Sequence, residues 1–230
     1  MGVIEILSSR REYTKLNPFI VLLGKGDHQI TSSWTAPSGA ELQTTLNMTC
    51  SNIMFIGQGK DTTTILGGFA IENVENITIK NMTVTNKGEN AAGIYMMNTK
   101  VELYDVVLKG CENCSLIFTP STLETIVVAT RCEFANSRHG VIVAGSFNSA
   151  TFNNCVFHDN ENEGIIGTQS ATVHLHGEAT AIHSNGADGI CAFTSAKVII
   201  HLPSHHNTSY NNGNEDRKTF NGGTITNVED

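Results

Sequence analysis

Residues 77–86, ITIKNMTVTN, contain the unit that the rest of the chain repeats. Aliphatic residues alternate with polar ones on both sides of Asn81, a pattern typical of half-buried β-strands. Asn tolerates the left-handed backbone conformation, so a single Asn between two short strands predicts a bend. The stretch therefore predicts two short strands joined at a sharp corner.

The same unit recurs at intervals of about two dozen residues, so its positions form columns. Two columns are expected to point inward; the first contains Met82, Val106, Cys132, Cys155 and Thr180, and the second Val84, Leu108, Phe134, Phe157 and Ile182. Two columns are expected to form bends; the first contains Asn81, Asp105, Arg131 and Asn154, and the second Asn86, Gly110, Asn136, Asp159 and Ser184. A third strand in several repeats begins with Gly and aliphatic residues, as at Gly93, Gly140, Gly164 and Gly189.

Similarity at a fixed period of this length indicates a solenoid. Three short strands per repeat, without a helical pattern between them, predict an all-β, single-stranded right-handed parallel β-helix of about eight coils. We expect residues 1–17 to form an N-terminal cap with a short amphipathic helix, and Trp34 to pack over it. The β-helix is expected over residues 18–206, followed by a polar tail or final capping strand over 207–230.

Three stretches carry a resemblance to a known family: FIVLLGKGDHQI at residues 19–30, IMFIGQGKDTTTILGG at 53–68, and ITIKNMTVTN. The chain resembles the pectin-lyase-like superfamily of right-handed parallel β-helices. The resemblance implies the fold over most of the chain. It leaves function open, because polysaccharide lyases, hydrolases, esterases, epimerases, phage tailspikes and non-enzymatic interaction domains share this fold.

Charge and composition disfavour some classes of partner and indicate a location for the protein. The net charge is −8 and no cluster of Lys and Arg stands out, which disfavours nucleic acid as a partner. No apolar run reaches the length of a membrane span, so we expect no membrane partner. The first residues, MGVIEILSSRREY, are too charged for a signal peptide, so we expect a cytoplasmic location and reduced cysteines, with Cys132 and Cys155 packed in the core.

A polar column precedes the Gly-initiated strands and is the candidate catalytic edge. It contains His139, Glu163 and Asp188, with Arg138 beside His139. The resemblance implies that an enzyme of this superfamily would hold its acidic and basic groups on neighbouring coils. The motifs of its hydrolases and esterases are not found, so two interpretations stay open: a catalytic set or solvated turn residues.

Three histidines form a candidate metal site. If Val173 and Leu175 point inward, His174 and His176 point outward, and His201 aligns with His176 one coil later. Three imidazoles could bind Zn²⁺ or another divalent late transition metal, and no other cofactor is expected. The alternative is a ladder of exposed histidines without a metal.

The Gly-initiated strands also predict an apolar stripe on the outside of the β-helix, formed by Tyr95, Ile117, Ile142, Ile166 and Cys191. A contiguous exposed apolar stripe marks a partner-binding face, unless the tail or the N-terminal segment covers it. The leading hypothesis is therefore a non-catalytic interaction or assembly module that binds another protein. The alternative is a polysaccharide-processing enzyme, a lyase or hydrolase, or a carbohydrate-binding module.

Overall fold

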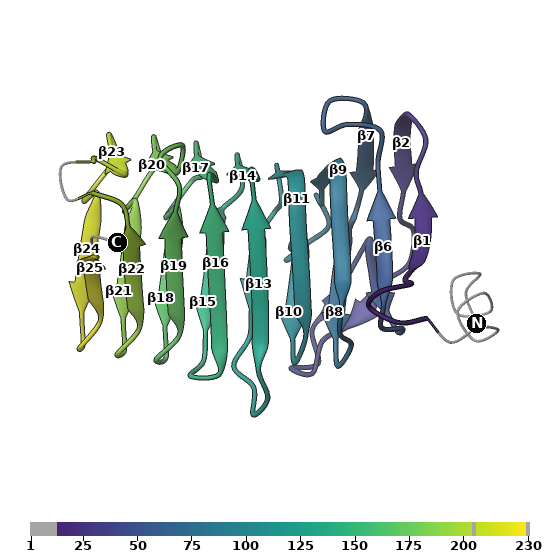
Figure 1. The fold of residues 1–230 in the computed structure, drawn as a ribbon, viewed down its shortest axis with the longest axis horizontal. Coiled ribbons are helices and arrows are strands. Elements are labelled where there is room, and N and C mark those ends of the chain that lie inside the picture. The colour runs from purple at the N-terminus through teal and green to yellow at the C-terminus, as the bar shows by residue number, and fades with distance from the viewer. Residues whose placement is uncertain (1–12, 204–205, 229–230) are drawn as a thin grey trace.

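A computed structural model describes residues 13–203 and 206–228 as an elongated stack of β-strands. The strands run across the long axis, and the first and last coils lie at opposite ends of the stack (Figure 1). The described residues contain no helix, and hence none that could cross a membrane. The predicted helical cap falls mostly on residues 1–12, outside the described residues, and an isolated bridge joins Thr14 and Asn17.

The long sheet has fifteen strands. They are β1 (Phe19–Leu22), β2 (Gly26–Gln29), β6 (Ile53–Ile56), β7 (Thr63–Leu66), β9 (Ile77–Thr85), β11 (Lys100–Lys109), β13 (Thr125–Thr130), β14 (Glu133–Ala135), β16 (Asn148–Asn153), β17 (Val156–His158), β19 (Thr172–His176), β20 (Ala181–His183), β22 (Lys197–His201), β23 (Ser209–Tyr210) and β25 (Thr224–Asn227). Because β9 and β11 continue through the bend, this sheet joins two ladders of strands. The first ladder contains β1, β6, β13, β16, β19, β22 and β25 with the first halves of β9 and β11, and the second contains β2, β7, β14, β17, β20 and β23 with their second halves.

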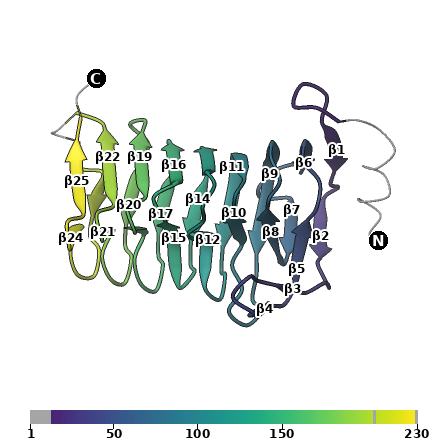
Figure 2. The same ribbon diagram turned by 90° about the horizontal axis from the view of Figure 1, so that it is seen from below.

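The second sheet lies across the core from the first ladder (Figure 2). Its eight strands are β5 (Thr45–Met48), β8 (Gly68–Glu72), β10 (Ile94–Met97), β12 (Cys114–Phe118), β15 (His139–Ala144), β18 (Ile165–Thr168), β21 (Ile190–Phe193) and β24 (Arg217–Phe220). Each strand pairs in parallel with its counterpart one coil away. The predicted all-β parallel solenoid is therefore confirmed.

The predicted inward columns are buried. Phe134 pairs with Phe157, and Phe157 with Ile182, in strands of successive coils. All ten residues of the two columns are at most 2% exposed. Cys132 and Cys155 are among them, and all six cysteines are free thiols, as expected. Like residues stacked at the strand spacing thus form one continuous core.

The predicted bends adopt the left-handed conformation, with φ between 51° and 63° at eight of the nine positions. Asn86 is the exception, and the prediction for it was wrong. Its side chain is buried and donates to the carbonyl of Ala92 at 3.1 Å. A side chain turned into the core replaces the bend at this coil.

Buried asparagines form a hydrogen-bonded ladder beside the second bend column. The amide of Asn160 donates to Asn185 at 2.9 Å, and the amide of Asn185 donates to Asn212 at 2.9 Å. Asn160 and Asn185 also donate to the carbonyls of Phe134 and Phe157. The ladder satisfies backbone groups that each left-handed bend removes from the sheet.

Residues 209–227 extend the β-helix. Strands β23, β24 and β25 pair with β20, β21 and β22, and β25 is the last strand within residues 207–230, where a final capping strand was one of the two expectations. At the other end, β3 (Trp34–Thr35) and β4 (Glu41–Leu42) form an antiparallel hairpin. Trp34 packs against the ring of Tyr95 on the second sheet, while the cap over which it was expected lies mostly outside the described residues.

Candidate functional site

The β3–β4 hairpin creates a groove on the outer face of the second sheet. Trp34 and Leu42 are buried against Ala70 and Tyr95, with the rings of Trp34 and Tyr95 4.8 Å apart. The Tyr95 hydroxyl lies 3.0 Å from Oγ1 of Thr119 on the next coil. These contacts fix the hairpin to the sheet and hold Tyr95 in place.

The groove has a volume of about 390 Å³ and is mostly apolar. Its lining residues are Ala36, Pro37, Ser38, Ala40, Leu42, Asn90, Ala92, Tyr95, Met97, Asn113, Ile117, Thr119 and Pro120. Tyr95 and Ile117, two residues of the predicted apolar stripe, are therefore part of it. This volume lies at the lower end of the range for ligand sites and suits one or two side chains of a partner.

The stripe continues beyond the groove along the paired strands. Ile117 pairs with Ile142, Ile142 with Ile166, and Ile166 with Cys191. The three isoleucines are half-buried, whereas Tyr95 and Cys191 at the two ends are buried. Burial raises the pKa of the Cys191 thiol to about 11, so it is not a reactive thiolate. Part of the stripe is thus covered by the hairpin, while its middle faces outward.

The polar edge beside the stripe brings only two of its predicted members, His139 and Glu163, into contact, whereas Asp188 pairs with Lys218, which was not predicted. Nδ1 of His139 lies 2.8 Å from Oε2 of Glu163, and this hydrogen bond lowers the pKa of Glu163. Oδ2 of the buried Asp188 lies 3.3 Å from Nζ of Lys218. The side chain of Arg138 is exposed. Each carboxylate therefore has a basic partner within the protein.

The three predicted histidines do meet on the outer face of the first ladder. His176 pairs with His201, and their rings stack with centroids 4.0 Å apart. Nδ1 of His174 lies 3.0 Å from Nε2 of His201. One ring nitrogen from each residue lies within 4.8 Å of the others, an arrangement that can hold a metal ion. Burial lowers the pKa of His174, and the neighbouring His201 and His176 lower it further.

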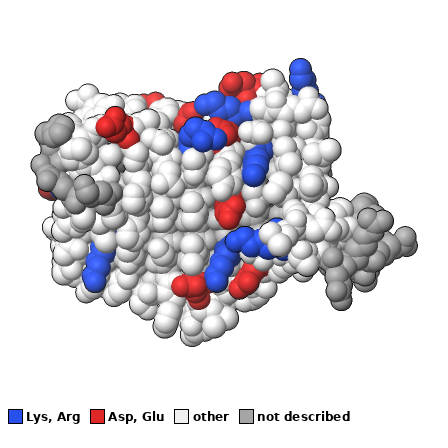
Figure 3. Space-filling model, viewed as in Figure 1, with Lys and Arg blue, Asp and Glu red and all other residues white. Residues whose placement is uncertain are grey.

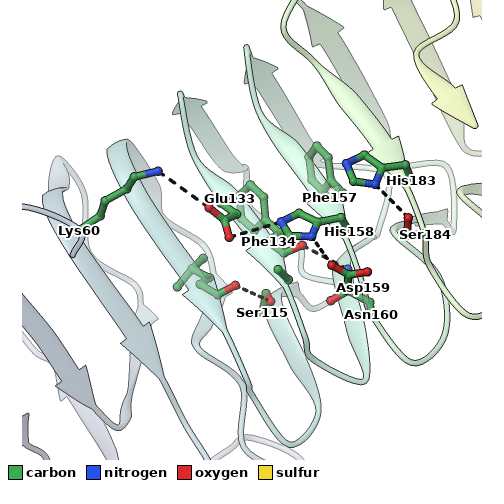
Figure 4. Close-up of polar contacts among 12 residues, drawn as sticks. Lys60, Ser115, Glu133, Phe134, Phe157, His158, Asp159, Asn160, His183 and Ser184 are labelled. Atoms are coloured by element: carbon green, nitrogen blue, oxygen red, sulfur yellow. Dashed lines mark hydrogen bonds and ion pairs between the residues drawn. The ribbon is translucent and has the colours of Figure 1, made fainter.

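A second polar cluster, on the outer face of the second ladder, was missed in the sequence (Figure 4). His158 lies between two carboxylates: Nε2 is 3.3 Å from Glu133 and Nδ1 is 2.7 Å from Asp159. Lys60 approaches Glu133 at 3.9 Å, and the ring of His183 stacks on that of His158. The sequence signal that could have predicted this cluster is the recurrence of polar residues next to Phe134 and Phe157. Here His158 is held by its neighbours rather than aimed at a cavity.

The chain matches the family model for a right-handed β-helix region over residues 31–180. No curated protein matches it. The A-module of the mannuronan C-5 epimerase AlgE4 of Azotobacter vinelandii is similar, with 14% identity, a TM-score of 0.39, and coverage of 80% of this chain and 68% of that one. ORF18 of Geobacillus virus E2 is similar at 10% identity and a TM-score of 0.37, covering 91% of this chain and 53% of that one.

At these identities and scores, neither structure bears on what this chain does. The family match is of another kind, because it spans more than half of the sequence and agrees with the strand pairing seen in the fold. It also agrees with the predicted right-handedness. The chain therefore belongs to the family of right-handed β-helix proteins.

Proposed function

We propose that this protein is a non-catalytic interaction module that binds a segment of another protein along the outer face of its second sheet. The observation that carries the proposal is the continuity of the groove with the half-buried stripe at Ile117, Ile142 and Ile166. Apolar side chains left half-exposed over several coils favour burial by a partner. The groove beside Tyr95 would take an anchoring side chain of that partner.

The architecture favours recognition through side chains. Within each sheet of the described residues, interior strands are paired on both sides, so their backbone donors and acceptors are already used. An added strand could pair only at the two ends of the stack. A partner lying across β12, β15 and β18 would instead contact the stripe residue by residue, with the hairpin as a wall on one side.

Polysaccharide processing is the weaker proposal. A glycosidase needs a carboxyl group that stays protonated to act as an acid, and this requires a raised pKa. Glu163 has a lowered pKa because it accepts a hydrogen bond from His139, and Asp188 is paired with Lys218. These contacts suit a turn-stabilising role better than acid catalysis.

Photo-crosslinking in the native source tests the proposal. A benzophenone amino acid replaces Ile142 in one variant and Val128 in another; Val128 is a half-buried apolar residue on the first ladder and serves as the matched control. We expect a discrete crosslinked protein from position 142 that is absent from position 128. Mass spectrometry then identifies the partner.

Two results would overturn the proposal. Equal crosslinking from both positions would show that the stripe is not selective. Cleavage of a member of a polysaccharide panel, abolished by His139→Ala, would show that the polar edge is an active site.

A further inference from the structure

We propose that His174, His176 and His201 form a three-imidazole site for a divalent late transition metal such as Zn²⁺. This site is separate from the proposed protein-binding face, because it lies on the outer face of the first ladder. His174 and His176 are two residues apart on β19, so both point to that face. His201 on β22 is the register partner of His176.

The spacing of the three side chains fits one ion. In a tetrahedral zinc site with bonds of about 2.0–2.1 Å, two ligand nitrogens are roughly 3.4 Å apart. Here Nδ1 of His174 and Nε2 of His201 are 3.0 Å apart, and one ring nitrogen from each of the three residues lies within 4.8 Å of the others. Because the rings of His176 and His201 are stacked nearly parallel, with centroids 4.0 Å apart, they must rotate out of this stack to direct their nitrogens at one ion. The metal would replace the contact between His174 and His201.

The backbone that carries these ligands is held in place on both sides. Strand β19 pairs with β16 and β22, and β22 pairs in turn with β25. The inward neighbours Val173, Leu175 and Ile200 are fully buried. The backbone at the three ligands is therefore already ordered, so metal binding loses little backbone conformational entropy, which favours affinity.

The surroundings select the class of ion. On β16, β19 and β22 the outward residues beside the histidines are Thr151, Asn153, Thr172, Ile199 and Lys197, and none is a carboxylate. Over β13 and β16 this face shows few Lys, Arg, Asp or Glu side chains (Figure 3). Among the described residues the grouped ligands are imidazoles only, which suits Zn²⁺, Ni²⁺ or Cu²⁺ rather than Ca²⁺ or Mg²⁺, which need oxygen ligands.

Three protein ligands leave a coordination position facing solvent. A structural zinc site closes all four positions with protein side chains, whereas an open position accepts water or a donor from a bound molecule. His174, His176 and His201 are half-buried, so the site is partly open to solvent. The inferred site is thus an exchangeable surface site rather than one on which folding depends.

Calorimetric titration of ZnCl₂ into the full chain, purified without a polyhistidine tag, tests the inference. We expect one Zn²⁺ per chain for the unaltered protein and at least an about 10-fold weaker affinity for His176→Asn, because one of three ligands is lost. His183→Asn is the matched control, since His183 also stacks on a neighbouring histidine, but on the second ladder. Its affinity should equal that of the unaltered protein.

A second readout separates metal loss from misfolding. Thermal unfolding with chelator present should give the same midpoint for His176→Asn and the unaltered protein, whereas added Zn²⁺ should raise only the midpoint of the latter. Equal zinc affinity in His176→Asn and the unaltered protein would overturn the inference. So would a lack of zinc binding by the unaltered protein, or equal losses in His176→Asn and His183→Asn.

Discussion

Phe134 and Phe157 stack face to face, with ring centroids 4.8 Å apart and planes inclined by 8°, although they belong to different coils. Phe152 meets both rings edge-on, at 5.5 and 5.0 Å. The three side chains are fully buried. This triad joins the first and second ladders across the core, and its members Phe134 and Phe157 belong to one of the stacked columns on which the fold depends.

Phe157→Ala is expected to destabilise the protein by about 3–5 kcal/mol, because it removes a fully buried ring and leaves a cavity beside Phe134 and Phe152. Urea unfolding followed by circular dichroism measures the change. Thr151→Ala, a half-exposed position on the same face of the molecule as the proposed metal site, should change stability by less than about 0.5 kcal/mol. Similar small losses for both variants would argue against a core built from stacked columns.

Asn185→Ala tests the asparagine ladder. Asn185 accepts from Asn160, donates to Asn212 and donates to the carbonyl of Phe157, all at 3.2 Å or less. Its truncation leaves buried partners unpaired, each costing about 1–3 kcal/mol, so we expect a total loss of at least about 2 kcal/mol. The half-exposed Asn153 provides the control as Asn153→Ala. A loss of under about 0.5 kcal/mol for Asn185→Ala would mean that water replaces the ladder.

The pair of His139 and Glu163 makes stability depend on pH in one direction. The hydrogen bond lowers the pKa of Glu163 below its unfolded value of about 4.3. The stabilisation that the ionised Glu163 gives the folded state is therefore fully present above about pH 4.3 and is lost as the pH falls through the lower folded pKa. The partly exposed pair should contribute up to about 1 kcal/mol. Glu163→Gln should therefore lower the urea midpoint near neutral pH but hardly at all below the folded pKa.

Glu161→Gln is the control for this measurement, since Glu161 is exposed and lies two residues away. Its midpoint should follow that of the unaltered protein at every pH. A difference between Glu163→Gln and the unaltered protein that stays constant into acid would contradict the assignment of the effect to the ionised carboxylate.

Trp34 reports on the hairpin that forms one wall of the groove. It is the only tryptophan and is 8% exposed, packed on the ring of Tyr95. Tyr95→Ala should shift the fluorescence emission of Trp34 to longer wavelength and increase its quenching by acrylamide, because the indole gains contact with water. Tyr104→Ala, on the first ladder, should leave the emission unchanged. An unchanged spectrum in Tyr95→Ala would show that the hairpin is held by other contacts.

The repeat made the core and the bends predictable because side chains in strands alternate and only a few residue types tolerate a left-handed bend. Phe134, Phe157 and eight of nine bend positions follow from that rule. The same alternation brought His174 and His176 to one face. The alternation does not predict which part of an outward-facing stripe is covered by another segment, as Tyr95 is covered by Trp34.

The hairpin and the buried asparagines were not predicted, because they depend on contacts outside the repeat. The hairpin strands at Trp34 and Leu42 are two residues long, too short to show a period. The sequence does not mark Asn160 and Asn185 as buried, because Asn is usually exposed, although each directly follows a bend residue and turns into the core. Asn86 has the same role, and this explains why its expected bend was wrong.

The proposed protein-binding face is tested most directly by measuring the Kd of the crosslinked partner, once purified, for three forms of the chain. We expect Ile142→Asp to weaken binding by at least about 10-fold relative to the unaltered protein, because a carboxylate would be buried against an apolar partner surface. Val128→Asp, on the first ladder, should bind like the unaltered protein. Equal affinities for all three forms would contradict the proposed protein-binding face.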